Sequence, residues 1–197
     1  MSYGIERESH LGGYIVGLTD HGDPNTFATE VWDWMVSSGV RSVIDVGCGE
    51  GHSTKYFIDK GLEAIGVEGG ANAYKNSPVK EHLVLHDYTK GSFLTSKMYD
   101  AVWSCEFVEH VEERYSENFL TTFDCAFHVF MTHAIPGQQG YHHVNCKPAQ
   151  YWIDRLGLRG FRFDYTKSMM LRGMTNKMHV ANTLLVFEKT GGPRLAS

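Results

Sequence analysis

Short apolar runs alternate with amphipathic segments along most of this chain. Five runs rich in β-branched or aromatic residues predict strands at 42–46, 63–68, 82–86, 99–104 and 127–132. Apolar residues at helical spacing predict helices at 53–59, 116–125 and 148–156, and two closing strands are predicted at 161–163 and 183–188. Apolar strands that alternate with helices form parallel sheets covered on both faces, so the pattern predicts an α/β fold.

The length of 197 residues suits one domain spanning residues 1–197. Residues 1–22 are rich in Gly, His and Tyr without a clear period, and we expect an N-terminal arm or lid there. Asp23 and Pro24 form a helix-start signal, and apolar residues follow at helical spacing until Gly39, so a leading helix is predicted over 23–39.

The overall charge disfavours one class of partner. The net charge is -5, the wrong sign for a protein whose affinity comes from neutralising phosphates, so we expect no nucleic-acid partner. No apolar run approaches the roughly 18 residues of a membrane span, so no membrane partner is expected. The four cysteines form no Cys-x-x-Cys pair and no secretory signal is visible, which predicts free thiols and a cytoplasmic location.

Three glycines at alternate positions follow the first predicted strand, in the turn from Asp45 to Gly51. Glycine lets a backbone approach a ligand closely, and the turn opens a helix whose free N–H groups favour ligand oxygens. The next strand ends in Glu68, a position from which a carboxylate commonly binds a ribose diol. Asp87 and Tyr88 follow the third strand, where an adenine amino group can be recognised. These positions predict a nucleoside ligand.

Details of the turn separate the possible nucleoside ligands. A dinucleotide-binding loop has Gly or Ala one residue beyond Gly51, where this chain has His52. The Gly-Lys-Ser/Thr step of a P-loop is missing. The carboxylate of Asp45 would repel a pyrophosphate, but it suits the cationic, amine-bearing end of S-adenosylmethionine.

The stretch from Val43 to Gly51, together with Glu68 and Asp87, resembles the cofactor motifs of class I S-adenosylmethionine-dependent methyltransferases. Residues 101–111, which end in Glu-His-Val, resemble the fourth-strand motif of the small-molecule branch of that family. The resemblance implies a Rossmann-like three-layer α/β/α sandwich with a mostly parallel seven-stranded sheet, an antiparallel last strand, and residues 40–190 as the cofactor-binding and catalytic core. It also implies S-adenosylmethionine as cofactor, S-adenosylhomocysteine as product, and cofactor contacts from Asp45, Gly47, Gly49, Gly51, Glu68, Asp87, Tyr88 and Ser104.

The ends of the fourth and fifth predicted strands hold the candidates for acceptor chemistry. Methyl transfer to a hydroxyl requires that the oxygen be aligned and its proton removed. Glu106 lies just past the fourth strand, His133 ends the fifth, and His142, His143 and Asn145 lie in the following loop. We expect His143 to be the base, because methyltransferases resembling this chain carry a His-Val-Asn step here. Asn145 would orient it, with Glu106 or His133 in support.

Two further roles, acceptor binding and metal binding, are considered for residues of this region and of the N-terminal arm. Tyr14 of the arm, His142 and Asn145 are expected to bind the acceptor. A divalent metal ion is an alternative, and its ligands would be Glu106, His133, His142 and His143, although their spacing is no recognised metal motif.

The leading hypothesis is therefore O-methylation of a hydroxyl on a sugar, glycan or small molecule. No Asn-Pro-Pro-aromatic or Asp-Pro-Pro-aromatic step follows the fourth strand, which disfavours amino-methylation of adenine or glutamine. The alternatives are an N- or C-methyltransferase acting on a small metabolite, and a catalytically silent module that binds S-adenosylmethionine. We expect a monomer or a homodimer.

Overall fold

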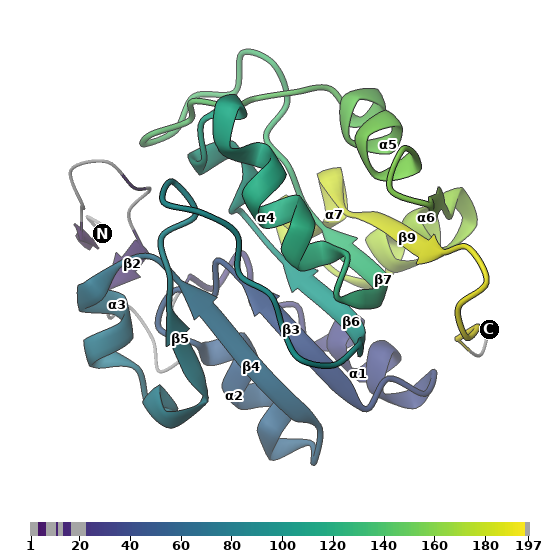
Figure 1. Ribbon diagram of the computed structural model, residues 1–197, viewed down its shortest axis with the longest axis horizontal. Coiled ribbons are helices and arrows are strands. Elements are labelled where there is room, and N and C mark those ends of the chain that lie inside the picture. Colours follow the sequence, from purple (N-terminus) through teal and green to yellow (C-terminus); the bar gives the residue numbers. More distant parts are fainter. Residues whose placement is uncertain (1–3, 7–10, 12–13, 17–22, 196–197) are drawn as a thin grey trace.

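The computed structural model describes the backbone of residues 4–6, 11, 14–16 and 23–195, and the side chains of 11 and 23–195. The main sheet has seven strands in the order β5-β4-β3-β6-β7-β9-β8 (Figure 1). Its strands are β3 (Ser42–Val46), β4 (Glu63–Glu68), β5 (Leu83–Leu85), β6 (Tyr99–Ser104), β7 (Ala126–Met131), β8 (Phe161–Phe163) and β9 (Leu185–Lys189). Strand β9 pairs antiparallel with both β7 and β8, whereas the pairings from β5 to β7 are parallel.

Helices cover both faces of this sheet. Strands of buried β-branched residues present apolar side chains on both sides, so each face must be covered by a helical layer. One core joins the sheet to α4 (Ser116–Phe123) and α5 (Ala149–Gly157), which lie on the near face in Figure 1. The other core joins it to α1 (Thr29–Ser37), α2 (His52–Asp59), α6 (Tyr165–Met174) and α7 (Met178–Thr183). The three-layer α/β/α prediction is confirmed, including the antiparallel last strand.

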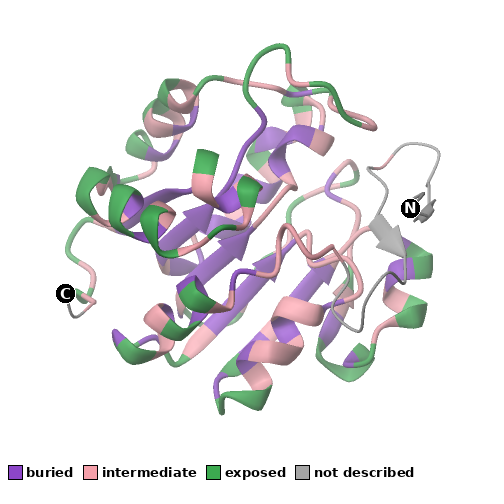
Figure 2. Cartoon of the chain, turned by 180° about the vertical axis from the view of Figure 1, so that it is seen from behind, coloured by how far each residue is buried: buried purple, intermediate pink, exposed green. Residues whose placement is uncertain are grey.

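The remaining elements are short. Strands β1 (Gly4–Glu6) and β2 (Tyr14–Val16) pair antiparallel as a separate two-stranded sheet. Helix α3 (Ala71–Asn76) follows β4, and three single turns of 3₁₀ helix are η1 (Lys80–His82), η2 (Val108–His110) and η3 (Glu113–Tyr115). Figure 2 shows that burial is concentrated in the strands, while the outer faces of the helices are exposed. No helix among the described residues is long and apolar enough to cross a membrane.

The leading helix starts later than the sequence predicts. Residues 24–26 form a turn, and the helix begins only at Thr29. The side-chain carboxylate of Asp23 accepts a hydrogen bond from Asn25 N–H at 2.8 Å, and the backbone carbonyl of Asp23 accepts one from Thr26 N–H at 3.1 Å. Asp23 therefore closes a local turn instead of capping a helix, a competition typical of short acidic side chains.

The last predicted strand is also shifted. It was expected from Thr183, but that residue ends α7, and β9 begins at Leu185. Leu184 N–H still donates to the carbonyl of Val180 at 3.1 Å, and the Thr183 hydroxyl donates to the carbonyl of His179 at 2.9 Å. Thr183 therefore belongs to the hydrogen-bonded end of the helix, although its β-branched side chain favours a strand.

The order of the strands fixes where a ligand binds. Strand β3 pairs with β4 on one side and with β6 on the other, so the chain reverses its direction of travel across the sheet at this point. Connections on opposite sides of such a switch point leave a crevice beyond the carboxyl ends of the strands. The residues after β3, β4, β5 and β6 should therefore meet in one place.

Candidate active site

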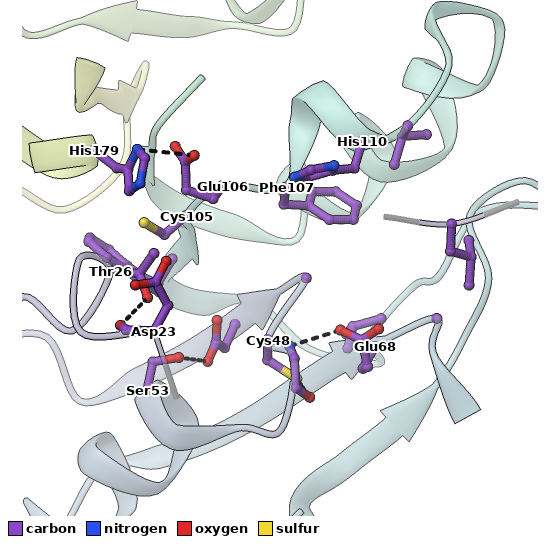
Figure 3. A pocket seen from close by; sticks show the side chains of 18 of the residues that line it. Asp23, Thr26, Cys48, Ser53, Glu68, Cys105, Glu106, Phe107, His110 and His179 are labelled. Carbon is purple, nitrogen blue, oxygen red and sulfur yellow. Dashed lines mark hydrogen bonds and ion pairs between the residues drawn. The ribbon is translucent and has the colours of Figure 1, made fainter. Parts of the chain in front are cut away.

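A cavity of about 390 Å³ lies beyond the carboxyl ends of these strands. This volume falls within the range of small-molecule sites. One half is walled by the glycine turn after β3 and by the ends of β4 and β5. The other half is walled by residues after β6, by the loop after β7 and by α7 (Figure 3). The predicted residues that line the cavity are Asp45, Gly47, Gly49, Glu68, Asp87, Tyr88, Glu106 and His143.

The glycine turn adopts a backbone that other residues rarely take. Gly47 has a φ of +74°, and a Cβ added to it would lie 2.2 Å from Cδ2 and 2.6 Å from Cβ of Phe107. The phenylalanine therefore packs directly on the turn, which requires glycine both for its φ and for the close approach. Gly51 has a φ of +79° at the start of α2 and packs against Leu83, outside the residues that line the cavity.

Asp45 lies at the base of the turn and is only 2 % exposed. Its carboxylate accepts hydrogen bonds from the hydroxyls of Ser53 at 2.5 Å and Thr54 at 2.7 Å. Burial raises the pKa of Asp45 to about 6, although these hydrogen bonds oppose the rise. Asp45 therefore fastens the first turn of α2 to β3. Asp45 also lines part of the cavity.

Glu68 joins the end of β4 to the glycine turn. One carboxylate oxygen accepts from Gly49 N–H at 2.8 Å, and the other accepts from Gly70 N–H at 2.7 Å. Each oxygen retains lone-pair capacity after these bonds, so the carboxylate can accept further hydrogen bonds from a ligand. Burial raises the pKa of Glu68 to about 7 against the effect of the backbone donors, and nearby Asp45 raises it further.

The residues after β5 have partners within the protein. The carboxylate of Asp87 accepts from the backbone N–H and the hydroxyl of Thr89, at 2.8 and 2.7 Å, and pairs with Lys90 at 3.3 Å. Tyr88 is buried, and its hydroxyl donates to Thr122 Oγ1 at 3.0 Å. Its ring lies edge-on to Phe107 with centroids 5.7 Å apart, so this tyrosine offers the cavity an aromatic wall. Burial raises the pKa of its phenol above the ordinary value.

Glu106 lies in the half of the cavity that is walled by residues after β6, by the loop after β7 and by α7, which we call the acceptor half. It follows β6 with a φ of +51°, one of two non-glycine residues with positive φ in the described part of the chain. Such strain persists only where surrounding contacts impose it, and it is common at functional sites. Thr132 Oγ1 accepts from Glu106 N–H at 2.8 Å, and His179 Nδ1 lies 3.2 Å from Glu106 Oε2 (Figure 3). The strained backbone thus aims the carboxylate at His179 across the cavity wall.

His143 comes from the loop between β7 and α5. Its Nδ1 lies 3.3 Å from the carbonyl oxygen of Gln138. A carbonyl can only accept, so Nδ1 carries the proton and Nε2 of the neutral ring keeps its lone pair. The ring lies directly over Gly140, where an added Cβ would come 2.1 Å from Nε2. This tautomer leaves Nε2 able to take a proton or to bind a cation.

Glu109 and His110 form η2 beside this loop. Glu109 is fully buried, and neither carboxylate oxygen has a hydrogen-bond partner in the described structure. Burial and the nearby charge of Glu106 raise the pKa of Glu109 well above its ordinary value. His110 lines the cavity, and its ring centroid lies 5.0 Å from that of His143. Burial, followed by the neighbouring His143, lowers the pKa of His110 to about 4.

Several predicted residues lie outside the cavity. His133 is 2 % exposed, and its Nδ1 lies 3.4 Å from the carbonyl of Ala134, while burial lowers its pKa. Asn145 is buried and donates to the Val108 carbonyl at 3.3 Å. Ser104 is buried, and His142 does not line the cavity. The Tyr14 side chain lies outside the described residues.

The set expected to bind a metal is therefore not brought together. Of Glu106, His133, His142 and His143, only the first and the last line the cavity. The cavity instead includes His110 and His179, neither of which is among the candidate site residues predicted from the sequence. His179 belongs to α7, about 70 residues beyond Glu106 in the chain, and only the tertiary fold joins the two. No spacing rule on a single sequence reveals such a pair.

Comparison with known proteins connects this sequence and fold to methyltransferases. Residues 44–124, from β3 to the end of α4, match the family model described as a methyltransferase domain. Over 56 residues the chain is 32% identical to an uncharacterized methyltransferase of Mycobacterium tuberculosis. That alignment covers 28% of this chain and 23% of the relative, so the chain spans less than a quarter of the length of the curated relatives it matches.

Solved structures share the fold over most of the chain. A magnesium protoporphyrin IX methyltransferase from Synechocystis superposes with a TM-score of 0.62 at 15% identity, covering 84% of this chain and 83% of that one. A SAM-dependent methyltransferase from Archaeoglobus fulgidus gives 0.59 at 17% identity, covering 85% and 95%. The glycopeptide N-methyltransferase MtfA gives 0.56 at 14% identity, covering 82% and 85%. The protein therefore has the fold of class I methyltransferases.

Proposed function

We propose that this protein is an S-adenosylmethionine-dependent methyltransferase that methylates a hydroxyl group on a sugar, glycan or other small molecule. The observation that carries the proposal is the division of one cavity into two chemically different halves. A glycine turn and the carboxylate of Glu68 at the end of β4 line one half, and proton-accepting groups line the other. A donor and an acceptor bound in the two halves meet within the same enclosure.

The half walled by the glycine turn and the ends of β4 and β5, which we call the cofactor half, suits S-adenosylmethionine in detail. The turn around Gly47 and Gly49 lets the methionine and ribose approach the backbone closely. Glu68 is held by two backbone N–H groups and retains lone pairs for the ribose hydroxyls. The Tyr88 ring lines this half beside Phe107 and offers an apolar contact for the adenine. The matched family and the SAM- and SAH-bound neighbours support this choice of cofactor.

The acceptor half suits a neutral oxygen nucleophile. The sulfonium already activates the methyl group, so the protein must align the acceptor and remove its proton. Two groups in this half can take that proton, Nε2 of His143 and the carboxylate of Glu106. As the acceptor oxygen forms its bond to the methyl carbon, the carbon–sulfur bond breaks and its electron pair returns to sulfur. The products are a methyl ether, neutral S-adenosylhomocysteine and a protonated base.

A calorimetric titration with S-adenosylmethionine tests the first half. We expect binding, and we expect Glu68→Ala to weaken it by about 1–3 kcal/mol because charge-assisted hydrogen bonds are lost. His82→Gln is the control, since His82 is exposed on η1 and does not line the cavity. No binding by the unaltered protein would refute the proposal, and an unchanged affinity in Glu68→Ala would remove that residue from the ribose.

Release of S-adenosylhomocysteine in the presence of candidate acceptors tests the second half. We expect turnover with a hydroxylated sugar or small molecule, and a roughly 100-fold or greater fall in kcat for Glu106→Gln and His143→Gln, the usual size of general-base effects. Turnover restricted to amine or carbon acceptors would point to N- or C-methylation. Cofactor binding without turnover on any acceptor class would identify a silent binding module.

A further inference from the structure

Three metal-ligating side chains converge at the wall of the acceptor half. Glu109, His110 and His143 each place one ligand atom within 4.8 Å of the others. The first two come from η2 and the third from the loop after β7. Backbone N–H groups of Val144 and Asn145 donate to the carbonyl of Glu109, at 2.9 and 3.1 Å, and fasten the loop to η2. The three donors therefore belong to one braced substructure.

The environment of Glu109 independently points to a ligand. Its side chain is 0% exposed, and both of its oxygens lack a hydrogen-bond partner within the described part of the chain. Nδ1 of His110 is also buried without a partner there. Buried carboxylates are normally paired, hydrogen-bonded or bound to a metal, because burial of an isolated charge is strongly unfavourable. Neither oxygen of Glu109 makes a hydrogen bond of ordinary geometry within the described residues, and a cation between these three groups would supply the missing partner.

We propose that Glu109, His110 and His143 bind one divalent first-row transition metal ion, such as Zn²⁺, Mn²⁺ or Co²⁺. Two imidazoles and a carboxylate suit these ions, whereas Ca²⁺ and Mg²⁺ prefer sets made of oxygen. With metal–ligand bonds of about 2.1 Å, donor atoms lie roughly 3–4 Å apart, so shifts of about 1 Å close the set. The Nδ1–H of His143 donates to a backbone carbonyl, as metal-binding imidazoles commonly do, and this leaves Nε2 as the ring atom that can bind the ion.

The position of the site gives the ion a task, and this step rests on the proposed function. His110 and His143 line the cavity, and Glu109 lies behind them, so the free coordination positions face the acceptor half. An acceptor with two neighbouring oxygens, such as a vicinal diol, can fill those positions. Coordination lowers the pKa of a hydroxyl. His143 is then a ligand, so the hydroxyl proton passes to Glu106, which His179 holds at 3.2 Å.

Metal binding is tested on the full chain after treatment with EDTA and removal of the chelator. Zn²⁺ and Mn²⁺ are titrated by calorimetry, and Co²⁺ is followed by its visible absorption. We expect one ion per chain, and a loss of affinity of tenfold or more in each of Glu109→Gln, His110→Gln and His143→Gln. His82→Gln, which removes an exposed histidine outside the cavity, should bind as the unaltered protein does.

A second readout guards against unfolded variants. The ion should raise the Tm of the unaltered protein and of His82→Gln but leave the three ligand variants unchanged. Because Glu109 is buried, Glu109→Gln can fail to fold, and His143→Gln, whose ring lines the cavity, then carries the test. Absence of binding by all three ions, or binding that survives His143→Gln and His110→Gln unchanged, overturns the proposal.

The same preparation separates this inference from the proposed function. S-adenosylmethionine is titrated into the protein in the presence of EDTA. Cofactor binding without any metal binding would overturn the metal site and leave the methyltransferase proposal standing. Metal binding without cofactor binding would overturn the methyltransferase proposal and leave the metal site standing. Turnover that stops with EDTA and returns on addition of the ion supports both, whereas turnover unaffected by EDTA refutes the catalytic task of the ion.

Discussion

Replacement of Gly47 by alanine tests the reasoning about the glycine turn. Gly47 has a φ of +74°, which costs an L-residue roughly 1–2 kcal/mol. The new Cβ would also lie 2.2 Å from Cδ2 and 2.6 Å from Cβ of Phe107. Rotation of the phenylalanine ring cannot relieve the contact with its own Cβ, so the backbone must move. Overpacking of this kind typically costs about 1–3 kcal/mol.

The two costs together predict a loss of about 2–5 kcal/mol in the free energy of unfolding. Gly61→Ala is the matched control, because Gly61 has a φ of +83° and nothing lies within 4 Å of its added Cβ. This control should lose only the conformational part, about 1–2 kcal/mol. The difference between the two variants therefore isolates the steric contact with Phe107.

Urea denaturation followed by circular dichroism measures both variants. A Gly47→Ala variant that is no less stable than Gly61→Ala would show that the turn accommodates a side chain, and the close packing on Phe107 would be refuted. The same substitution should weaken the binding of S-adenosylmethionine, because the displaced turn is the wall of the cofactor half. Gly61→Ala should leave that affinity unchanged, since Gly61 lies beyond the end of α2, away from the cavity.

Three further predictions concern single side chains. The folded-state pKa of Glu68 is raised from 4.5 to about 7, so its contribution disfavours folding increasingly as the pH rises through that interval. The unfolding free energy of the cofactor-free protein should therefore fall with rising pH by at most about 3 kcal/mol from this group, and a parallel pH series on Glu68→Gln should lack that part of the slope. Asp164 caps α6 by accepting from Lys167 N–H at 2.9 Å, so Asp164→Ala should cost about 1 kcal/mol in urea denaturation, and no loss would exclude the cap. His179→Gln should lower kcat on the order of tenfold through misplacement of Glu106, with the affinity for S-adenosylmethionine unchanged, and an equal loss of both would assign His179 to cofactor binding.

The cofactor half of the cavity was predictable because its residues lie at the ends of strands or within two residues of them. Glu68 lies at the end of β4, and Asp87 comes two residues after the end of β5, so a correct strand assignment places them at one edge of the sheet. The sequence could not show how each side chain is used. Asp45 was expected to face a cationic ligand, yet it binds two hydroxyls of α2, and Asp87 closes a local turn. Hydrogen bonds between neighbours in space decide these roles.

The acceptor half was less predictable because loops and strain build it. His133 lies two residues after the end of β7, and that position alone suggested a catalytic role, but the chain turns its side chain into the interior. Glu106 follows β6 in the same manner and reaches the cavity because its backbone takes a positive φ, which no propensity for glutamate predicts. Whether a polar residue after a strand enters the site therefore depends on one or two backbone dihedrals, and these are set by packing.

The same argument explains why the proposed metal ligands differ from those expected on the sequence. The expected set took the residues that follow strands together with a pair of adjacent histidines. The structure instead joins Glu109 and His110, which were not among the predicted ligands, with only one histidine of that pair. The decisive contact is the pair of hydrogen bonds from the loop to the Glu109 carbonyl, between residues 35 or 36 positions apart in the chain. The local sequence therefore shows a carboxylate next to a histidine, Glu109 and His110, in the short turn after β6. Whether these two residues can bind a metal ion depends on which side chain the distant loop places against them.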